Sequence, residues 1–429
     1  MSDDARTGPD RREAALRREL WRTRNSASFR LGNHLIEAAR KPWRILALPI
    51  SLPLVTWQIG MELLGRRPRP MSDSMIQLKG GPERSIVLFP TNGVGFGHFT
   101  RMYGLARRLR RLDPDLEIIF FTTQPTLHLP YLDGFPTYHL AGPKKFKGME
   151  SEAWNAMVQE MLTLVLETHR PQTFVFDGAF PYRGMLDALD TIAVPQKVWL
   201  RRAMFRKGSS IPVDSICKFD LIVHPEDAVP LPPSEIDHGV EVLTVPPMTL
   251  IDSDEMWSRE DARNRLGVPQ NARVAYVQLG AGRINEIDSD VRQVTDALLA
   301  YEDIHVVLGE SLLGDRLRIN LERVHLIRDY PNALFFNAFD VSVQAGGYNS
   351  FHEMRKLGIP TLFLPNMNTG MDDQLARCKV AEDEDWGIVQ QSNQQLSTSI
   401  DELLKMKSKE SINSPNGHTG LSIHILEGM

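Results

Sequence analysis

The chain has 429 residues, of which 42% are hydrophobic and 24% charged, and its formal net charge is −5 at pH 7. This length predicts two or three domains, and the composition is typical of a globular protein with sizeable cores. The two cysteines, Cys217 and Cys378, lie in no CxxC or Cys/His ligand spacing. This excludes a disulfide framework and a structural zinc site, and it indicates a reducing compartment.

The charge is distributed unevenly along the chain. Residues 1–70 carry 14 Lys and Arg against 7 Asp and Glu, a net of +7, so the other residues carry 35 against 47, a net of −12. A basic segment on an acidic body predicts an anionic partner at that end only. Nucleic acid is excluded as a partner, because the body has no basic patch with interleaved aromatic residues.

The amino-terminal arm combines a basic, partly amphipathic helical region with the uncharged run "ILALPISLPLVTWQIGM", residues 45–61. Its 17 residues are near the lower limit of about 17–25 for a membrane-spanning helix. Pro49 and Pro53 make it a poor straight helix. It is no cleavable signal peptide, since the apolar part begins late and no small-residue cleavage site follows.

Basic residues flank this run on both sides, and Trp43 and Trp57 stand where interfacial aromatic residues would lie. We therefore predict that the apolar segment, residues 45–61, lies in the headgroup region of an anionic leaflet and that residues 1–70 contact the membrane surface. Residues 1–80 form this arm and the linker into the first folded domain. Two alternatives stay open, an arm packed on the protein's own body or on a second subunit, and a true span. The first interpretation predicts a cytoplasmic protein, peripheral at the inner face of the plasma membrane.

From Ser85 onward, strand-like and helix-like segments alternate, which predicts an α/β fold with helices on both faces of parallel sheets. Strands are predicted at "SIVLF", "LEIIFFTT", "TFVFD", "QKVWL", "FDLIVH", "ARVAYVQL", "IHVVLG", "VSVQAG" and "PTLFLP". The stretch "VLTVPPMTLIDSDEM" has the prolines and turn residues of an interdomain connection. We predict two Rossmann-like domains, residues 81–250 and 251–405, facing a cleft. The tail, residues 406–429, is expected to be partly disordered, although its end "GLSIHILEGM" could dock on the fold.

The most informative segment is Val341–Arg377. Its first strand ends in Gly346 and Gly347, and a helix then opens with Asn349 and Ser350. Free backbone N–H groups at this helix start, together with the helix dipole and a serine hydroxyl, suit a diphosphate. A simpler alternative is that Asn349 or Ser350 only caps the helix.

Acidic and amide side chains follow the predicted diphosphate site. Glu353 lies one helical turn on, where it could accept hydrogen bonds from ribose hydroxyls, and a second strand delivers Asp372, Asp373 and Gln374, which suit sugar hydroxyls. As alternatives, Glu353 could be an ordinary first-turn acid, and the Asp pair could only be solvated in its loop.

The pattern "GGYNSFHE…GIPTLFLP…DDQ" resembles the nucleotide-sugar signature of GT-B glycosyltransferases, above all those of family 28 and the UDP-glucosyltransferases of plant natural products. The resemblance implies two Rossmann-like domains of the GT-B architecture. It also implies that the glycine and serine region holds a diphosphate, Glu353 the ribose, and Asp373 with Gln374 the donor sugar.

One position departs from this signature, because Ala345 stands where the plant-type pattern has a phosphate-binding histidine. Diphosphate binding would then depend on backbone amides, on Ser350 and on the "GAGR" turn with Gly280, Gly282 and Arg283.

The stretch "GVGFGHFTRM" matches the first glycine loop of the same enzymes, in which Gly93, Gly95 and Gly97 would allow close approach of acceptor or diphosphate. Under the resemblance, His98 is the general base for the acceptor hydroxyl and Asp177 is its carboxylate partner. Imidazole is the side chain best suited to take up a proton at neutral pH. As an alternative, His98 only binds phosphate or backbone.

Two further groups of charged residues have more than one interpretation. The basic stretch "LRRAMFRKGSS", with Arg201, Arg202, Arg206 and Lys207, could line the acceptor side and suit an anionic acceptor, or it could be a solvated loop. The Asp252/Asp254 and Asp288/Asp290 pairs precede helices and are interpreted as capping acids. We therefore expect no catalytic metal and no cofactor other than the UDP-sugar co-substrate.

The sequence thus predicts an inverting glycosyltransferase that moves a hexose or N-acetylhexosamine from a UDP-sugar to an envelope or lipid-linked acceptor hydroxyl. The choice of uracil comes from the resemblance. Two alternatives stay open, a nucleotide-sugar 2-epimerase of the same architecture and a non-catalytic sugar-nucleotide-binding subunit.

Overall fold

A computed structural model describes residues 24, 26–64, 84–91, 95–202, 215–230, 239–280, 288–314, 316–317, 319–368, 372–412 and 414–429. By its internal contacts the chain divides into two units, Met1–Gly81 and Pro82–Met429. The two Rossmann-like domains both belong to the second unit.

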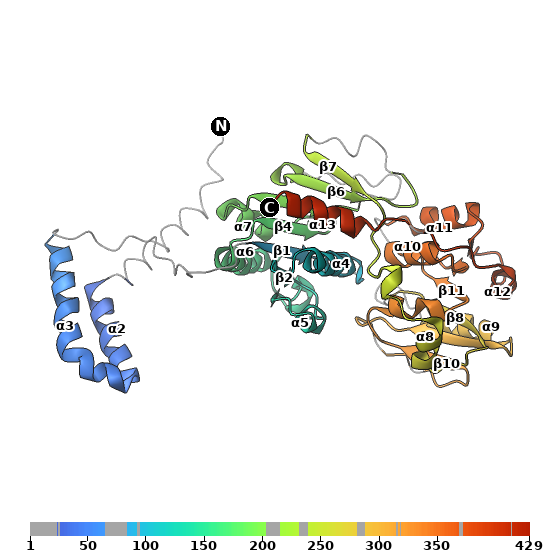
Figure 1. Cartoon of the computed structure of the whole chain (residues 1–429), viewed down its shortest axis with the longest axis horizontal. Coiled ribbons are helices and arrows are strands. Elements are labelled where there is room, and N and C mark those ends of the chain that lie inside the picture. The colour runs from blue at the N-terminus through green and yellow to red at the C-terminus, as the bar shows by residue number, and fades with distance from the viewer. Residues whose placement is uncertain are drawn as a thin grey trace. The chain divides into compact units, whose positions relative to one another are not determined.

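The first unit contains a helical hairpin made of α2 (Ala27–Arg40) and α3 (Pro42–Leu63) (Figure 1). The hydroxyl of Ser26 caps α2 by accepting a hydrogen bond from the N–H of Phe29. We expected Pro49 and Pro53 to disturb the apolar run, yet α3 continues through both. A proline removes only one N–H donor, so a helix can continue where the neighbouring turns keep theirs.

The second unit begins with a parallel seven-stranded sheet in the order β3-β2-β1-β4-β5-β6-β7. Its strands are β1 (Ser85–Pro90), β2 (Glu117–Thr122), β3 (Thr137–His139), β4 (Thr173–Asp177), β5 (Gln196–Leu200), β6 (Leu221–Pro225) and β7 (Glu241–Val245). The strand order reverses at β1, which pairs with β2 on one side and with β4 on the other. Such a reversal leaves a crevice at the carboxyl ends of the two strands that diverge.

A second parallel sheet repeats this plan with six strands in the order β10-β9-β8-β11-β12-β13. These strands are β8 (Arg273–Gln278), β9 (Ile304–Gly309), β10 (Val324–Ile327), β11 (Val341–Gln344), β12 (Thr361–Phe363) and β13 (Gly387–Val389). The order reverses at β8, which pairs with β9 and β11. The predicted α/β fold of two Rossmann-like sheets is confirmed.

All nine predicted strands are present, but the sequence analysis missed four others, β3, β7, β10 and β13. These four are the edge strands of the two sheets. The interdomain connection predicted from the sequence includes residues that in fact belong to β7. An edge strand is open to solvent along one side, so its sequence is short and only partly apolar, as the mixed burial of β3, β7 and β10 illustrates.

Helices cover both sheets. In the first domain they are α4 (Gly97–Leu112), α5 (His128–Leu132), α6 (Ser151–His169) and α7 (Arg183–Thr191), with short 3-10 helices η1 (Pro143–Lys145) and η2 (Ile216–Lys218). The second domain contains η4 (Ser253–Glu255), α8 (Arg259–Leu266), α9 (Asp288–Leu299), η5 (Asn332–Ala338), α10 (Tyr348–Leu357), α11 (Gln374–Asp383) and α12 (Leu396–Lys405). Gly267 closes α8 in the left-handed conformation with φ of 67°.

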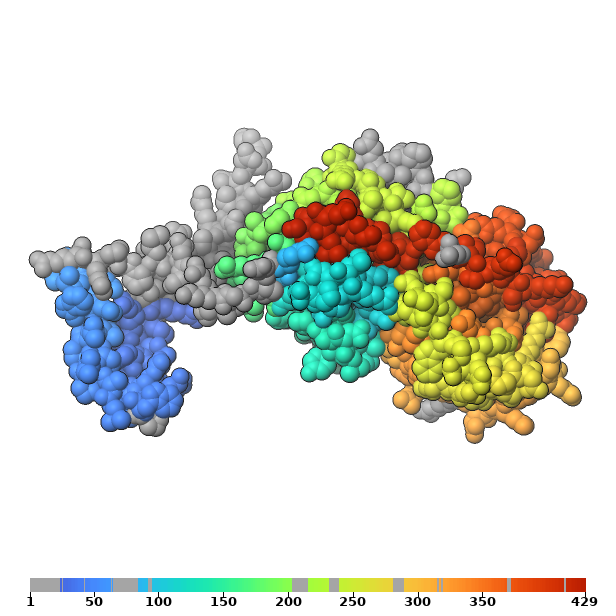
Figure 2. All heavy atoms as spheres, viewed as in Figure 1, coloured from blue at the N-terminus to red at the C-terminus, as the bar shows by residue number. Residues whose placement is uncertain are grey.

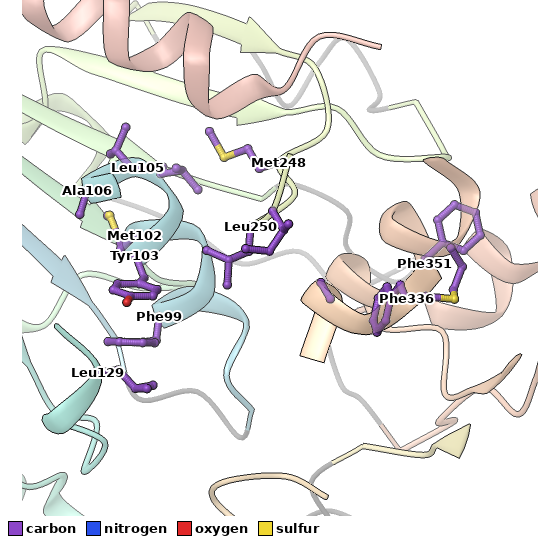
Figure 3. Close-up of a cluster of buried hydrophobic side chains, with 14 of the residues drawn as sticks. Phe99, Met102, Tyr103, Leu105, Ala106, Leu129, Met248, Leu250, Phe336 and Phe351 are labelled. Atoms are coloured by element: carbon purple, nitrogen blue, oxygen red, sulfur yellow. The ribbon is translucent and has the colours of Figure 1, made fainter. Parts of the chain in front are cut away.

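One hydrophobic cluster includes residues of both domains. Side chains of α4 such as Phe99 and Met102 belong to it with Met248 and Leu250 of the connection and with Phe336 and Phe351 of the second domain (Figure 3). The connection between the two sheets is therefore part of the core and not a free linker.

The chain ends in helix α13 (Gly417–Glu427), which packs on α4 of the first domain. Figure 2 shows this last segment, in red, against the elements of the first domain. The end of the tail is therefore docked, the possibility that the sequence analysis left open for "GLSIHILEGM". The reason is long-range packing, because Leu421 and Ile425 are fully buried on a surface that only the folded domain provides.

His418 seats α13 on α4. Its Nε2 lies 2.8 Å from the carbonyl oxygen of Arg101, and its ring is fully buried. Burial, together with the charge of Arg108, lowers the pKa of His418 to about 3, so the ring is neutral at pH 7. A Cβ atom on Gly104 would lie 2.6 Å from this ring, so the close approach requires glycine at that position.

Gly104→Ala should therefore destabilise the protein by about 1–3 kcal/mol, since the buried ring cannot move aside. Gly420, on the exposed side of α13, would have no atom within 4 Å of an added Cβ, so Gly420→Ala should instead stabilise by about 0.4–1 kcal/mol. Urea unfolding of both variants measures the difference. Equal effects would contradict the docking of α13 on Gly104.

Candidate functional site

The predicted site residues follow the strands at which both sheets reverse. Gly95, Gly97 and His98 come after β1, and Asp177 ends β4. Gly280 follows β8, and Gly346 and Gly347 follow β11. The register pairs Pro90 with Asp177 and Gln278 with Gln344, so each pair of strands ends at the same level. These are the positions at which doubly wound sheets bind ligands.

His98 and Asp177 form a hydrogen-bonded pair. The Nδ1 atom of His98 lies 2.6 Å from Oδ1 of Asp177. If Nδ1 carries the proton and donates it to this carboxylate, Nε2 is left with a free lone pair. In the part of the chain that the structure describes, Nε2 has no hydrogen-bond partner, and the His98 side chain is 24% exposed. In this tautomer the imidazole can accept a proton from a bound molecule; in the other tautomer Nδ1 accepts a hydrogen bond from Arg101, whose terminal NH2 lies 2.9 Å away.

Arg101 shares the carboxylate of Asp177. Its Nε donates to Oδ2 at 2.9 Å and its terminal NH2 to Oδ1 at 2.8 Å. Burial raises the pKa of Asp177, but the charges and hydrogen bonds of Arg101 and His98 outweigh burial and hold the pKa below its usual value. Asp177 is thus a charged group that orients the imidazole, and its negative charge is partly compensated by Arg101.

The sequence analysis missed Arg101, although a signal for it was present. Arg101 stands three residues after His98 in a predicted helix, and residues three apart lie on the same helical face. What the helical spacing could not reveal was that Asp177, 76 residues further on, would meet both side chains.

The amino terminus of α10 is open, as the diphosphate interpretation requires. Gly347 is the N-cap residue and no side chain caps the helix. Among the described residues, no hydrogen-bond partner is found for the N–H groups of Tyr348, Asn349 and Ser350, while the N–H of Phe351 donates to the carbonyl of Gly347. The alternative that Asn349 or Ser350 caps the helix is therefore not what the structure has. Unpaired amides at a helix start favour an anion.

The two glycines before α10 have different roles. Gly346 adopts a φ of 78°, and a Cβ there would meet Sγ of Cys378 at 2.3 Å, so the turn requires glycine. A Cβ on Gly347 would meet no atom within 4 Å of it, which leaves open space above the helix start. Gly280 also has a positive φ, 102°, and open space around it.

The first glycine loop is described only in part. Gly95 has open space at its Cβ position, and a Cβ on Gly97 would contact Arg101 at 3.6 Å. Gly93, Gly282 and Arg283 lie outside the described residues, as do Arg206 and Lys207. Their predicted roles stay predictions.

Glu353 is half-buried and carries no hydrogen bond or ion pair within the described structure. Burial raises its pKa to about 8, and Lys356 lowers it only slightly. Burial raises the pKa of the Tyr276 and Tyr330 hydroxyls, and the nearby carboxyl of Glu353 raises both further. A partly buried carboxyl without a hydrogen-bond partner lowers the stability of the protein. Glu353 is therefore suited to bind a hydrogen-bond donor of a ligand.

The predicted donor-sugar residues all have partners within the protein. Asp373 caps α11 by accepting a hydrogen bond from the N–H of Ala376 at 3.0 Å, and Gln374 Oε1 accepts from the N–H of Asn366 at 3.0 Å. Asp372 pairs with Arg202 at 3.1 Å and with Arg377 at 2.7 Å. Burial raises the pKa of Asp372, but these two arginines hold it below its usual value. The prediction that Asp373 and Gln374 bind a sugar stays a prediction.

Tyr348, the first residue of α10, connects the two domains. Its hydroxyl donates to the carbonyl of Glu226 at 3.0 Å and accepts from the N–H of Met248 at 3.2 Å. Three guanidinium groups lie over its ring, those of Arg202 at 5.3 Å, Arg101 at 5.8 Å and Arg377 at 5.9 Å from the ring centre. Tyr348 therefore brings the start of α10 next to the Asp177–His98 pair.

Arg377 joins the site across the domains. It donates two hydrogen bonds of 2.7 Å to Asp227 of the first domain and one of 2.9 Å to the carbonyl of Gly346. Asp227 also lies 3.3 Å from Nε2 of His352. The side chains of Arg377 and Asp227 are 0% and 5% exposed. The sequence analysis assigned neither residue a role, because a buried pair 150 positions apart leaves no local pattern.

The arginines of this region are paired with carboxylates. Asp177 binds Arg101, Asp227 binds Arg377, and Asp372 binds both Arg202 and Arg377. The side-chain charges therefore balance, and the unpaired positive potential comes from the amides of α10. Arg202 is the most exposed of the three arginines, with 20% of its side chain accessible against 3% for Arg101 and 0% for Arg377.

Other predicted residues have structural roles. Asp252 is part of a capping box with Glu255 at the start of η4, as the sequence predicted. Arg201 is buried against the ring of Trp199 rather than lining a surface. Over the described ranges, no three His, Cys, Asp or Glu side chains are grouped so that they could hold a metal ion.

No protein-family model and no curated protein matches this chain. Solved structures match it at low identity. The glycotransferase of kitacinnamycin is 15% identical with a TM-score of 0.58, and MurG of Acinetobacter baumannii is 11% identical with a TM-score of 0.51. UDP-GlcNAc 2-epimerase from Methanocaldococcus jannaschii is 12% identical with a TM-score of 0.54. These matches cover 80%, 81% and 80% of this chain and 99%, 100% and 99% of the matched chains.

The chain therefore has the GT-B fold, which confirms the predicted fold class and the resemblance to GT-B proteins. Both glycosyltransferases and a nucleotide-sugar epimerase match, so the fold alone leaves the choice between these activities open.

The raised pKa of Glu353 predicts a pH-dependent stability. The carboxyl of Glu353 has a pKa of about 8 in the folded protein, against about 4.5 in the unfolded chain. The free energy of unfolding is therefore highest below pH 4.5 and falls as the pH rises to 8, because only the unfolded chain ionises freely in this range. Glutamine stays neutral at every pH. The free energy of unfolding of Glu353→Gln should therefore be close to that of the wild type at pH 5 and about 1–3 kcal/mol higher than that of the wild type at pH 8. Urea unfolding at both pH values tests this. The exposed Glu402, mutated to glutamine, is the control and should show no such trend.

Proposed function

We propose that the protein is an inverting glycosyltransferase that transfers a hexose or N-acetylhexosamine from a UDP-sugar to the hydroxyl of an envelope or lipid-linked acceptor. The GT-B fold supports the general class. The observation that carries the proposal is a link between two elements from different domains, the uncapped start of α10 and the His98–Asp177 pair. Arg101 forms this link, because its guanidinium binds Asp177 and lies 5.8 Å from the ring centre of Tyr348.

The donor half of the proposal depends on α10. The diphosphate would accept hydrogen bonds from the unpaired amides of Tyr348, Asn349 and Ser350 and from the Ser350 hydroxyl, and Gly347 leaves room for its approach. The carboxylate of Glu353 would accept hydrogen bonds from the ribose hydroxyls. Burial makes ionisation of Glu353 unfavourable in the free protein, and the hydrogen bonds from the ribose would offset this cost.

The acceptor half depends on His98. The acceptor oxygen would attack the anomeric carbon as the bond from that carbon to the diphosphate oxygen breaks, and UDP would leave with the bonding electrons. The hydroxyl proton would pass to Nε2 of His98, and Asp177 would stabilise the imidazolium through Nδ1. Attack opposite the leaving group inverts the anomeric configuration.

The plant-type signature has a phosphate-binding histidine where this chain has Ala345. Arg202 is a candidate for the phosphate-binding side chain in its place. Its guanidinium lies 5.3 Å from the ring centre of Tyr348, at the start of α10, and is the most accessible of the three arginines there. Its partner Asp372 is also bound by Arg377, so Asp372 would stay paired if Arg202 turned to the diphosphate. Arginine binds phosphate oxygens well because it donates two parallel hydrogen bonds.

A 2-epimerase is the second candidate, because the M. jannaschii epimerase shares the fold at a TM-score of 0.54. The two activities differ in what they need. A transferase should release UDP only when an acceptor is added, whereas UDP release without an acceptor would favour the epimerase class. A binding subunit without activity would bind UDP-sugars and release no UDP in either condition.

The donor site is tested by a thermal-shift panel of nucleotide sugars on the wild type and on Glu353→Ala. At least one UDP-sugar should raise the wild-type melting temperature by a few degrees, and the shift should be mostly lost in the variant, since ribose would lose its acceptor. If UDP-sugars stabilise neither protein, or both equally, the donor-site assignment is wrong.

The base and the diphosphate ligand are tested with His98→Ala and Arg202→Ala. His98→Ala should lower kcat about 10²–10⁴-fold with donor binding unchanged, because it removes only the proton acceptor. Arg202→Ala should weaken UDP binding about tenfold, with partial rescue in Arg202→Lys. UDP-release kinetics and thermal shifts measure these effects, with His424→Ala on α13 as control. Wild-type kcat in His98→Ala would remove the general base from the mechanism.

A further inference from the structure

The α2–α3 hairpin exposes a stripe of large apolar side chains. On α3, Trp43, Leu46 and Ile50 are 67%, 85% and 72% exposed, and the stripe continues with Leu54 and Trp57 at 50% and 53%. These residues are three or four positions apart, so they lie on one helical face. Phe29, Leu35 and Ile36 of α2 are also exposed. A patch of this size marks an interaction surface.

Polar groups, by contrast, pair across the seam between the two helices. Arg30 forms an ion pair with Glu62, Arg44 forms one with Glu37, and Nε2 of His34 lies 3.0 Å from Oγ of Ser51. In water, a two-helix hairpin is expected to turn its apolar residues inward and its charges outward. Here only Ala38 and Ile59 of the described hairpin residues are buried, and the largest apolar side chains face outward. The exposed face of the hairpin is therefore suited to contact with an apolar environment and not with water.

The charge of this region identifies the kind of neighbour. Residues 1–70 have a net charge of +7, with Arg40, Lys41 and Arg44 at the junction of the two helices and Arg66, Arg67 and Arg69 after α3. The same hairpin of a second copy would bring the same positive charge to the contact, whereas an anionic bilayer would complement it. Tryptophans are also typical of the membrane–water interface.

We propose that the hairpin is an anchor that lies in the plane of one leaflet of an anionic bilayer, with the apolar stripe of α3 in the acyl region and its basic residues among the headgroups. By length and composition, Trp43–Glu62 is the one segment of the described chain that could cross a membrane. A spanning orientation is disfavoured because the three polar pairs hold α2 along α3. Spanning would carry Arg30, Glu37 and their partners into the hydrocarbon.

The length of α2 supports the same orientation. Its 14 residues extend about 21 Å at 1.5 Å per residue, too short to cross a hydrocarbon core of about 30 Å. The hairpin is also separate from the GT-B fold. The structures that match cover 80–81% of this chain and 99–100% of their own length. The second unit, Pro82–Met429, has 348 of the 429 residues, which is the same fraction of the chain as these matches cover.

The proposal is tested by co-sedimentation of the full-length protein with vesicles of phosphatidylcholine, with and without about 25% phosphatidylglycerol. Binding should be at least about tenfold stronger to the anionic vesicles and should fall in about 0.5 M NaCl. The triple variant Leu46→Asp, Ile50→Asp, Leu54→Asp should bind at least about tenfold more weakly. A matched control is Leu112→Asp with Leu164→Asp, two leucines of the second unit that are 49% and 60% exposed, and it should bind as the wild type does.

Three results would overturn the anchor. Equal binding to neutral vesicles that survives alkaline carbonate extraction would show a spanning helix. A wild type that ignores vesicles but doubles its mass in sedimentation equilibrium, unlike the triple variant, would show a self-association surface. If the wild type neither binds vesicles nor self-associates, the α2–α3 hairpin is not an anchor. The thermal shift with UDP-sugars, measured on the same samples, reports on the proposed function independently, so the two proposals can fail separately.

Discussion

The arrangement of the candidate site depends on the buried ion pair between Arg377 and Asp227. Arg377 belongs to the second domain and Asp227 to the first, and they share two hydrogen bonds of 2.7 Å in a region that solvent does not reach. Arg377 also holds the carbonyl of Gly346, in the turn that leads into α10. Loss of Arg377 would leave the buried carboxylate of Asp227 without its cation, which typically costs about 3–5 kcal/mol, whereas Arg377 keeps Asp372 as a second partner if Asp227 is lost. The same interaction therefore joins the domains and sets the turn.

This pairing also determines where positive potential remains. Each arginine near Tyr348 is bound to at least one carboxylate, so the basic side chains largely cancel and the unpaired donors are backbone amides at the start of α10. An amide site is fixed in direction by the helix, whereas a lysine or arginine side chain can turn away. Glu353 is the complementary case, an acidic group kept without a partner at a cost in stability. Both features are typical of sites that are completed by a ligand.

The sequence predicted the parts of this structure whose signal is local. The nine inner strands are mostly buried, so each appeared as an apolar run, whereas the edge strands β3, β7 and β10 are partly exposed and the edge strand β13 is only three residues long, and all four were missed. For α13 the sequence left docking open but could not say where, since its apolar residues are buried only on the surface around Gly104. Arg101, Tyr348 and Asp227 could not be assigned, because each acts through a partner in another part of the chain.

By itself the sequence determined the repeated strand–helix plan, the glycine turns and the residue types at the strand ends, because these depend on backbone propensity and hydrophobic spacing over a few residues. The tertiary structure decided which of those residues meet. It brought His98 to Asp177, joined both to α10 through Arg101 and Tyr348, and assigned Asp373 to a helix cap. It also showed that the polar residues of α2 and α3 face each other, which no spacing within one helix reveals. Contacts between distant segments form only when the chain has folded, so their energy leaves no short-range pattern.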